Sequence, residues 1–440
     1  MSTTTRTSGP PAVSFPEALR VWARIGLLSF GGPAGQIALM HRILVDERRW
    51  IDEKSFLSAL NFCMLLPGPE AMQLATYVGW RKHGTAGGLA AGLLFVVPGA
   101  LFMLLLALGY IAFGRAPLAE ALFFGVKAAV LAIVVEALLR IARRALKTNA
   151  DLWIAAAAFV AIFLLAIPFP IIVAAAALVG FLLQRAAPSA GQAASEATVA
   201  GAPVDAWSTL RTATLWLAIW IVPLALVAAI LGTDHVLAQL AWFFSKLAVV
   251  TFGGAYAVLA YMAQDVVEGY RWLEPGQMLD ALGLAETTPG PLILVTEFVG
   301  ALAASFHNGG NAYLMAVLGA LVALWATFAP CFLWIFAGAP YVERLNRAPR
   351  LSAALKGVTA AVVGVILNLT VWFALHVLFA SVSERHAGPL RLLIPDPATV
   401  SIPTLLLAVL AMVLIFALHR GIVTTLAICG GLALAWHALA

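Results

Sequence analysis

The sequence predicts an all-α polytopic membrane protein made of two homologous repeats, and three observations carry this prediction. Of the 440 residues, 62% are hydrophobic and 11% are charged, whereas soluble proteins carry about 25% charged residues. Apolar stretches of membrane length recur along the whole chain. Pro-Gly-Pro occurs inside two of these stretches, at 67–69 and 289–291. We therefore expect the lipid bilayer as a partner and no nucleic acid.

The internal duplication is visible without gaps. Residues 28–69 and residues 250–291 are identical at fourteen of forty-two positions, including Phe-Gly-Gly, Arg-Trp and Pro-Gly-Pro. After insertions the match resumes at an offset of 232, where Gly125-Val126 meets Gly357-Val358. We interpret the chain as two copies of one unit.

Each copy contains the same run of apolar segments, long enough to be helices that cross a bilayer. In the first copy they span 17–40, 54–80, 86–113, 119–145, 151–167 and 170–184. In the second copy they span 239–262, 277–304, 310–338, 353–380, 402–418 and 421–439. The predicted units are a disordered tail 1–16, a first repeat 17–185, a linker 186–209, a connecting membrane helix 210–232 and a second repeat 233–440.

This count of about 13 membrane segments favours an inverted repeat, because six crossings plus one turn the second copy upside down. With the N-terminus inside, sixteen Lys and Arg residues fall on the inside and seven on the outside, as the positive-inside rule requires. An alternative with re-entrant Pro-Gly-Pro segments and the N-terminus outside gives fifteen against eight. Both topologies remain open at this point.

Two kinds of helix break recur in the repeats. Pro-Gly-Pro interrupts a helix because proline lacks an N–H and clashes with the preceding turn. Phe-Gly-Gly follows a hydroxyl residue, Ser29 or Thr251, and glycine pairs allow a helix to open or to pack closely. Discontinuous helices bind charged substrates in transporters built from repeats. The alternative is that Pro-Gly-Pro is a simple proline kink with no role in binding. The predicted substrate-binding residues at these breaks are Ser29, Phe30, Gly31, Gly32, Gln36, Pro67, Gly68, Pro69, Gln73, Thr251, Gly253, Gly254, Thr287, Thr288, Pro289, Gly290 and Pro291.

Two cations occupy equivalent positions before the Phe-Gly-Gly breaks. Arg24 and Lys246 each precede the shared phenylalanine by six residues. A cation inside a membrane segment is costly, so it faces a cavity, a partner or the interface. We predict that both cations contact a bound anion together with the Pro-Gly-Pro helix ends; snorkelling to the membrane surface is the alternative.

The acidic residues divide by their surroundings. Asp52 and Glu274 are expected to cap helices, beside Trp50 and Trp272 as interface anchors. Burial disfavours the charged form of a carboxyl, so carboxyls in apolar segments are candidates for proton coupling. These candidates are Glu70, Glu136, Glu286 and Glu297, with helix-dipole stabilisation as the structural alternative for Glu70.

Other chemistries find little support in the sequence. The three cysteines are far apart and lack metal or redox spacing, so we expect packing roles. The sequence has no Walker-type phosphate loop, and its intramembrane Asp, Glu and His residues have no metal-ligand or nucleophile spacing. We therefore predict neither an ATP-driven pump nor an enzyme, and no cofactor or metal. A homodimer is compatible with the sequence.

Residues 30–92 resemble the chromate ion transporter family in its long-chain, two-unit form. The motifs that carry this resemblance are the Phe-Gly-Gly break, the loop around Trp50 and the run from Pro67 that reads PGPEAMQLATYVGW. The resemblance implies a carrier in the bacterial inner membrane that exports chromate, with sulfate as its structural analogue, and confers chromate resistance. The second copy departs from the motif, having Leu292 where the first has Glu70 and Ala255 where the first has Pro33.

Two other functions remain compatible with the same residues. One is a proton-coupled importer of sulfate or another oxyanion. The other is an anion channel, because broken helices also form selectivity filters. A channel would differ from a carrier in showing flux that does not saturate at modest substrate concentration.

The inverted topology predicts that single cysteines placed near residues 147 and 385 lie on opposite faces of the membrane. A membrane-impermeant maleimide added to intact cells and to everted vesicles measures this directly. Labelling of both positions from the same side contradicts the inverted repeat.

Overall fold

The computed structural model describes residues 13–30, 32–114, 116–186, 206–250, 252, 255–307, 310–342 and 348–439. Nearly all of these residues are helical, as the fold class predicts. The first copy comprises α1 (Phe15–Leu28), α2 (Gly32–His41), the π-helical turn η1 (Arg42–Glu47), α3 (Glu53–Leu65), α4 (Glu70–Phe113), α5 (Pro117–Ala145), α6 (Asn149–Phe163) and α7 (Phe169–Ala186).

The connecting helix is α8 (Ala206–Leu231). The second copy begins with α9 (Val236–Val250), α10 (Ala255–Gln264), the π-helical turn η2 (Asp265–Gly269), α11 (Pro275–Thr287), the 3₁₀ turn η3 (Leu292–Leu294), α12 (Val295–Phe306) and α13 (Ala312–Gly338). It ends with α15 (Pro349–Leu378), β1 (Val382–Ala387), β2 (Leu390–Pro395), α16 (Ile402–Met412), the π-helical turn η6 (Val413–Ala417) and α17 (Ile422–Leu439).

Within these described ranges, six helices are long and apolar enough to cross a membrane: α4, α5, α8, α13 with the turn that follows it, α15 and α17. Large apolar side chains on their outer surfaces are exposed, for example Leu105 and Ile230, which is typical of lipid-facing helices. The chain is therefore a multi-pass membrane protein. The count of thirteen segments and the inverted orientation remain predictions.

Helix α4 is a hairpin rather than one straight helix. Its backbone leaves the helical region at His83 and Gly84, and a Cβ added at Gly87 would lie 2.4 Å from the carbonyl oxygen of Gly79. Residues eight apart in a straight helix are about 12 Å apart along the axis. The second copy repeats this contact between α12 and α13, where a Cβ at Gly319 would lie 2.2 Å from the carbonyl oxygen of Gly300.

The two copies also share an unusual loop after their second helix, which is α2 in the first copy and α10 in the second. Each has a π-helical turn followed by an arginine with positive φ, 52° at Arg49 and 54° at Arg271. Asp52 and Glu274 then occupy the predicted N-cap positions of α3 and α11. Hydrogen bonds from Ser55 lower the pKa of Asp52.

The tryptophans of this loop lie elsewhere than predicted. Trp50 and Trp272 are each only 3% exposed, so they are packing residues and not interface anchors. Trp50 packs edge-on against Trp22, and Trp272 packs edge-on against Phe243. Each tryptophan thus fastens the loop to the first helix of its own copy.

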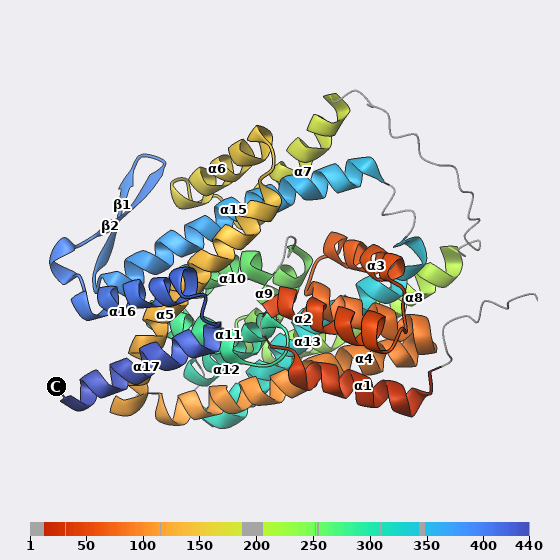
Figure 1. Ribbon diagram of the computed structural model, residues 1–440, viewed down its shortest axis with the longest axis horizontal. Coiled ribbons are helices and arrows are strands. Elements are labelled where there is room, and N and C mark those ends of the chain that lie inside the picture. Colours follow the sequence, from red (N-terminus) through yellow and green to blue (C-terminus); the bar gives the residue numbers. More distant parts are fainter. Residues whose placement is uncertain are drawn as a thin grey trace, which may run out of the picture.

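The central helices are α13 and α15, which are the most enclosed of the long helices. Helices α6 and α7 lie along α15, and the hairpin of β1 and β2 projects beyond its end (Figure 1). The all-α prediction missed this hairpin. Arg391 holds the hairpin in place. Its guanidinium lies 2.7 Å from the carboxylate of Glu268, and its backbone N–H donates to the carbonyl of Leu164.

The close glycine contact in the α4 hairpin is a testable packing constraint. Gly87→Ala pushes a methyl group onto the Gly79 backbone, and overpacking of this kind costs about 1–3 kcal/mol. We expect a lower apparent melting temperature in detergent. Gly109→Ala is the matched control, because nothing lies within 4 Å of an added Cβ there. An equal melting temperature for both variants contradicts the hairpin packing.

Candidate substrate site at the helix breaks

The first two segments of each copy are built from half-length helices. Helices α1, α3, α9 and α11 contain 14, 13, 15 and 13 residues, which corresponds to about 20–22 Å each. The hydrocarbon core of a bilayer is about 30 Å thick. A helix of this length that starts at the membrane surface ends inside the membrane, so we expect the breaks that follow to lie at membrane depth.

Pro-Gly-Pro ends the helix because of its backbone conformation. Gly68 has φ 112° and Gly290 has φ 90°, a region that residues with a side chain rarely adopt. The next helical turn starts at Glu70 in the first copy and at Leu292 in the second. The backbone groups of the two breaks therefore need partners from outside their own helices.

The breaks of the two copies supply partners to each other. The Gly290 N–H donates to the carbonyl oxygen of Ser29 at 2.7 Å. The Gly290 carbonyl accepts from Nε2 of Gln36 at 2.6 Å. Ser29 and Gln36 are 0% and 1% exposed, so both bonds are shielded from water. The Phe-Gly-Gly region of the first copy thus holds Pro-Gly-Pro of the second.

The hydroxyls at the breaks serve their own helices. Ser29 donates to the carbonyl of Ile25 at 2.6 Å, and Thr288 donates to the carbonyl of Ala285 at 3.1 Å. Phe30 is half-exposed. The predicted site residues Gly31, Thr251, Gly253 and Gly254 lie outside the described residues, and so does the side chain of Thr287.

Each Pro-Gly-Pro packs against a long helix of the other copy. A Cβ added at Gly99 of α4 would lie 2.3 Å from the Pro289 carbonyl oxygen, and one added at Gly68 would lie 3.1 Å from Sγ of Cys331 in α13. Gly99 and Cys331 are equivalent at the offset of 232. The two copies are therefore interlocked through their breaks.

Gln73 stabilises the first break from within its own copy. Its Nε2 donates to the carbonyl of Pro67 at 2.7 Å. Its side chain is fully buried, and among the described residues its Oε1 has no hydrogen-bond partner. This leaves a buried acceptor close to Pro-Gly-Pro.

A cavity lies where these elements meet, with room for about one water molecule. It is lined by the first residues of both half-helices that follow Pro-Gly-Pro, together with residues of α2 and α10. The lining residues are Pro33, Gln36, Pro69, Glu70, Ala71, Ala255, Pro291, Leu292 and Ile293. Two helix N-termini, one from each copy, thus converge on one space, and each presents unpaired N–H groups and the positive end of its dipole.

Glu70 is the ionisable residue of this lining. It is partly buried and is the first residue of α4, where a carboxylate is favoured by the helix dipole. In the second copy Leu292 takes its place. The cavity is therefore asymmetric in charge.

The two predicted cations lie away from this cavity and form ion pairs. Arg24 lies 3.7 Å from Glu47, and Lys246 lies 4.0 Å from Asp265. Lys246 also lies over the ring of Tyr261. Both acidic partners belong to the π-helical turns, η1 and η2, of their own copies. The structure thus gives the two cations equivalent surroundings without placing them at the breaks.

Two of the predicted proton-coupling residues share one cluster. Glu136 pairs with Arg140 one turn further along α5, and Glu286 accepts a hydrogen bond from Tyr256 at 2.8 Å. Arg140 also interacts electrostatically with Glu286 and Tyr256. The cluster therefore joins α5 of the first copy to α10 and α11 of the second.

Glu297 stands apart from this cluster. It is 1% exposed, and its Oε2 has no hydrogen-bond partner within the described part of the chain. Its neighbour Thr296 accepts a hydrogen bond from Thr327 at 3.3 Å. Sequence reasoning missed two further buried carboxylates, Asp151 and Asp280. For Asp280, its place in the apolar helix α11 was a usable signal.

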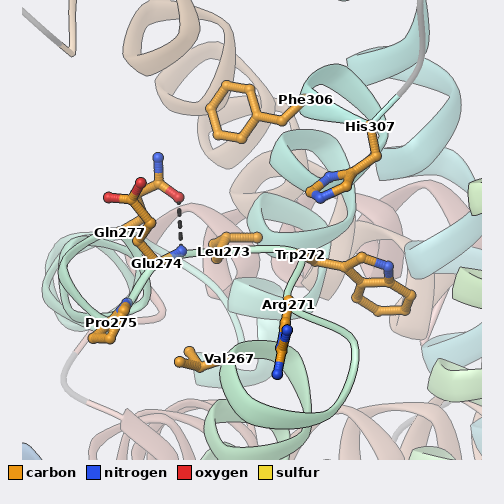
Figure 2. A pocket seen from close by; sticks show the side chains of 9 residues that line it. All are labelled: Val267, Arg271, Trp272, Leu273, Glu274, Pro275, Gln277, Phe306 and His307. Atoms are coloured by element: carbon orange, nitrogen blue, oxygen red, sulfur yellow. Dashed lines mark hydrogen bonds between the residues drawn. The ribbon is translucent and has the colours of Figure 1, made fainter.

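A second, larger pocket of about 430 Å³ lies at the loop around Trp272 (Figure 2). Its lining includes Arg271, Glu274 and His307, and the dashed line marks the bond from the Glu274 N–H to the side chain of Gln277. This pocket is at the far end of α12 from the break cavity. Fifteen residues from Leu292 to Phe306 separate the two, about 22 Å of helix.

The bond from Gln36 to Gly290 predicts a specific effect of one substitution. Gln36→Leu leaves a buried carbonyl without a donor, which costs about 1–3 kcal/mol. We expect a lower melting temperature. Gln239→Leu is the matched control, because Gln239 also donates to a backbone carbonyl, that of Asp234, but at an exposed site. Equal effects of the two substitutions contradict the proposed importance of the joined breaks.

Comparison with known proteins places the chain in a family. The family model described as Chromate transporter matches residues 17–181 and 238–435. A chromate transport protein of Pseudomonas aeruginosa is 35% identical over 82% of this chain and 82% of its own length. A chromate transport protein of Cupriavidus metallidurans is 31% identical over 83% of this chain and 84% of its own.

A probable chromate transport protein of Synechococcus elongatus is 31% identical over 82% of this chain and 85% of its own. No solved structure matches the chain. The resemblance expected from the Phe-Gly-Gly and Pro-Gly-Pro motifs is confirmed: this chain belongs to the chromate transporter family, a family of membrane transport proteins and not of enzymes.

Proposed function

We propose that this chain is a secondary active transporter that exports chromate across a bacterial inner membrane and thereby confers chromate resistance. The names of its relatives support chromate as the substrate. The observation that carries the proposal is the convergence of two half-helix N-termini, one from each copy, on one cavity. This arrangement suits a dianion, because each N-terminus offers N–H donors and partial positive charge.

The membrane potential favours export of such a substrate. Moving one charge across about 100 mV is worth about 2.3 kcal/mol, so a dianion gains about twice that on leaving the cell. This corresponds to roughly a thousandfold concentration gradient. Sulfate has the same charge and shape as chromate, so we expect it to compete for the site.

The small size of the cavity supports a carrier that moves between states rather than an open channel. The space holds about one water molecule, so binding of a chromate ion requires the two copies to move apart. In this cycle Arg24 and Lys246 release their carboxylates, Glu47 and Asp265, and contact the anion as the cavity opens. Their half-exposed side chains leave room for this movement.

Glu70 is the observation that supports proton-coupled oxyanion import as a second candidate function. A carboxylate beside a dianion in a low-dielectric cavity is strongly repelled. Glu70 therefore takes up a proton or moves away when the anion binds, which links anion binding to proton binding. A Glu70→Gln variant that loses only the pH dependence of transport favours this second function.

The experiment that tests chromate export is uptake of radiolabelled chromate into everted vesicles that contain the protein. We expect saturable accumulation that requires a membrane potential and is inhibited by sulfate. An ionophore that collapses the potential and vesicles without the protein are the controls. The proposal fails if inserted protein gives no accumulation, and proton-driven flux in the opposite direction favours the importer.

The two cations give a sharper prediction. Arg24→Gln and Lys246→Gln each remove a charge-assisted contact, so we expect the apparent KM for chromate to rise by about tenfold or more. Arg42→Gln is the matched control, because Arg42 also pairs with Glu47, at 3.6 Å, and is exposed. If Arg24→Gln and Lys246→Gln are inserted normally and leave KM unchanged, the assignment of these cations is wrong.

A further inference from the structure

A triad of side chains around one buried carboxylate connects the two copies outside the lining of the break cavity. Asp280 of α11 is 3% exposed. Its Oδ1 lies 3.3 Å from Nζ of Lys127 in α5, and its Oδ2 accepts a hydrogen bond from the hydroxyl of Tyr110 in α4 at 2.8 Å. Lys127 and Tyr110 belong to the first copy, whereas Asp280 belongs to the second.

This triad is a demanding arrangement for a membrane protein. Ionisable residues inside membrane segments are rare and commonly functional. A buried ion pair gains little stability over an apolar pair, but removal of one partner leaves an uncompensated charge. Apolar side chains would hold α5 and α11 together without the free-energy cost of removing charged groups from water.

The repeat shows that the fold does not require the pair. At the offset of 222, Asp280 corresponds to Ser58, and at the offset of 232, Lys127 corresponds to Thr359. Both equivalent residues carry hydroxyls and no charge. The ion pair therefore occurs at one of the two repeat-related sets of positions only, which separates it from the features that build the repeat.

The position of Asp280 links the triad to the substrate site. Helix α11 runs from the loop around Trp272 to Pro-Gly-Pro of the second copy, and Asp280 lies eight residues before Thr288. A shift of α11 against α5 would therefore move the Pro-Gly-Pro break whose Gly290 is held by Ser29 and Gln36. The triad is placed to control that shift.

We propose that Asp280, Lys127 and Tyr110 form a proton-operated latch between the two copies. The carboxylate form of Asp280 holds Lys127 and keeps α11 against α5, so the break cavity stays closed. Transfer of a proton to Asp280 neutralises it, weakens its attraction to the Lys127 ammonium and allows α11 to move. The latch rests on the proposed function in one respect, namely that the two copies move relative to each other during transport.

Few other groups interact with Asp280. Its titratable neighbours are Lys127 from α5 and Tyr110 from α4. Helices α12, α15 and α17 also pack against α11, and in the described ranges none of them contributes an ion pair or hydrogen bond to Asp280. The cluster around Glu286 lies six residues further along α11 and has its own partners, Tyr256 and Arg140.

A second ion pair in the chain provides a matched control. Lys356 of α15 lies 3.5 Å from Asp151, which is 4% exposed. Asp151 accepts hydrogen bonds from the backbone N–H groups of Lys147 and Thr148, so it caps α6. Asp151→Asn thus also removes a buried carboxylate that pairs with a lysine of the other copy, but this pair joins α6 to α15. The Asp280 pair instead joins α5 to α11, the helix that leads into Pro-Gly-Pro.

The test measures opening of the break cavity without any substrate. Cys63, Cys331 and Cys429 are replaced by alanine and Ala71→Cys is introduced, because Ala71 lines the cavity and is 3% exposed. The rate of maleimide labelling is measured in membranes at about pH 8 and about pH 5 for this parent, for Asp280→Asn and for Asp151→Asn. Dividing each variant's rate by the parent's rate at the same pH cancels the pH dependence of the thiol chemistry.

The latch predicts that Asp280→Asn is labelled at least about tenfold faster than the parent at the higher pH. The ratio of the two labelling rates is expected to approach one at the lower pH, where Asp280 of the parent is itself protonated. Asp151→Asn is expected to give a ratio near one at both pH values. The charge-exchanged double variant Lys127→Asp with Asp280→Lys is expected to restore slow labelling at the higher pH, which attributes closure to the ion pair itself. The parent-like labelling of Asp280→Asn at the lower pH is the evidence that the single variant is folded.

Three outcomes overturn the latch. A ratio near one at both pH values for Asp280→Asn means that the pair does not hold the cavity closed. A high ratio that is the same at both pH values means that a proton does not operate it. An equal response of Asp151→Asn means that the effect is general loosening. Because the assay contains no chromate, failure of the chromate transport experiment leaves this result standing, and the reverse also holds.

Discussion

An unpaired backbone group at membrane depth costs several kcal/mol, and the arrangement of the two copies follows from how this cost is avoided. Pro-Gly-Pro ends a half-helix at Gly290 and exposes its N–H and carbonyl. Both groups are satisfied by the first copy, through Ser29 and Gln36. The break can exist only where the other copy is present, so neither copy is expected to form this site alone.

The same constraint explains why the helix N-termini converge. Each Pro-Gly-Pro packs on the long helix of the opposite copy, at Gly99 in one case and at Cys331 in the other. The half-helices that restart after the breaks therefore point their first turns into a shared cavity. Partial positive charge at membrane depth is a consequence of how the breaks are joined, and it is obtained without placing a full cation in the cavity wall.

Much of this architecture was predictable from the sequence, because apolar length and helix-breaking residues report directly on local structure. Six apolar helices of membrane length, both Pro-Gly-Pro breaks, the Phe-Gly-Gly break of the first copy and the caps Asp52 and Glu274 agree with the structure. Contacts between residues far apart in the chain were not predictable. The pairing of Arg24 with Glu47 depends on the π-helical turn η1, which periodicity does not reveal. Burial of Trp50 follows from η1 and burial of Trp272 from the equivalent turn η2. The β1–β2 hairpin lies in a polar stretch with no repeat equivalent.

The differences between the copies carry the remaining functional information. An exact duplicate would place identical charges on both sides of the cavity and give the two halves no distinct roles. Here Glu70 of the first copy corresponds to Leu292 of the second. The residues of the Lys127–Asp280 pair correspond to two uncharged hydroxyl residues in the other copy. Both charged features lie where one copy meets the other. In the proposed transport cycle, the carboxylate of Glu70 responds to the bound anion, whereas that of Asp280, paired across the copies, responds to their relative position. Coupling of ion binding to movement needs both kinds of residue, and we propose that these asymmetric charges supply them while the shared breaks stay the same in both copies.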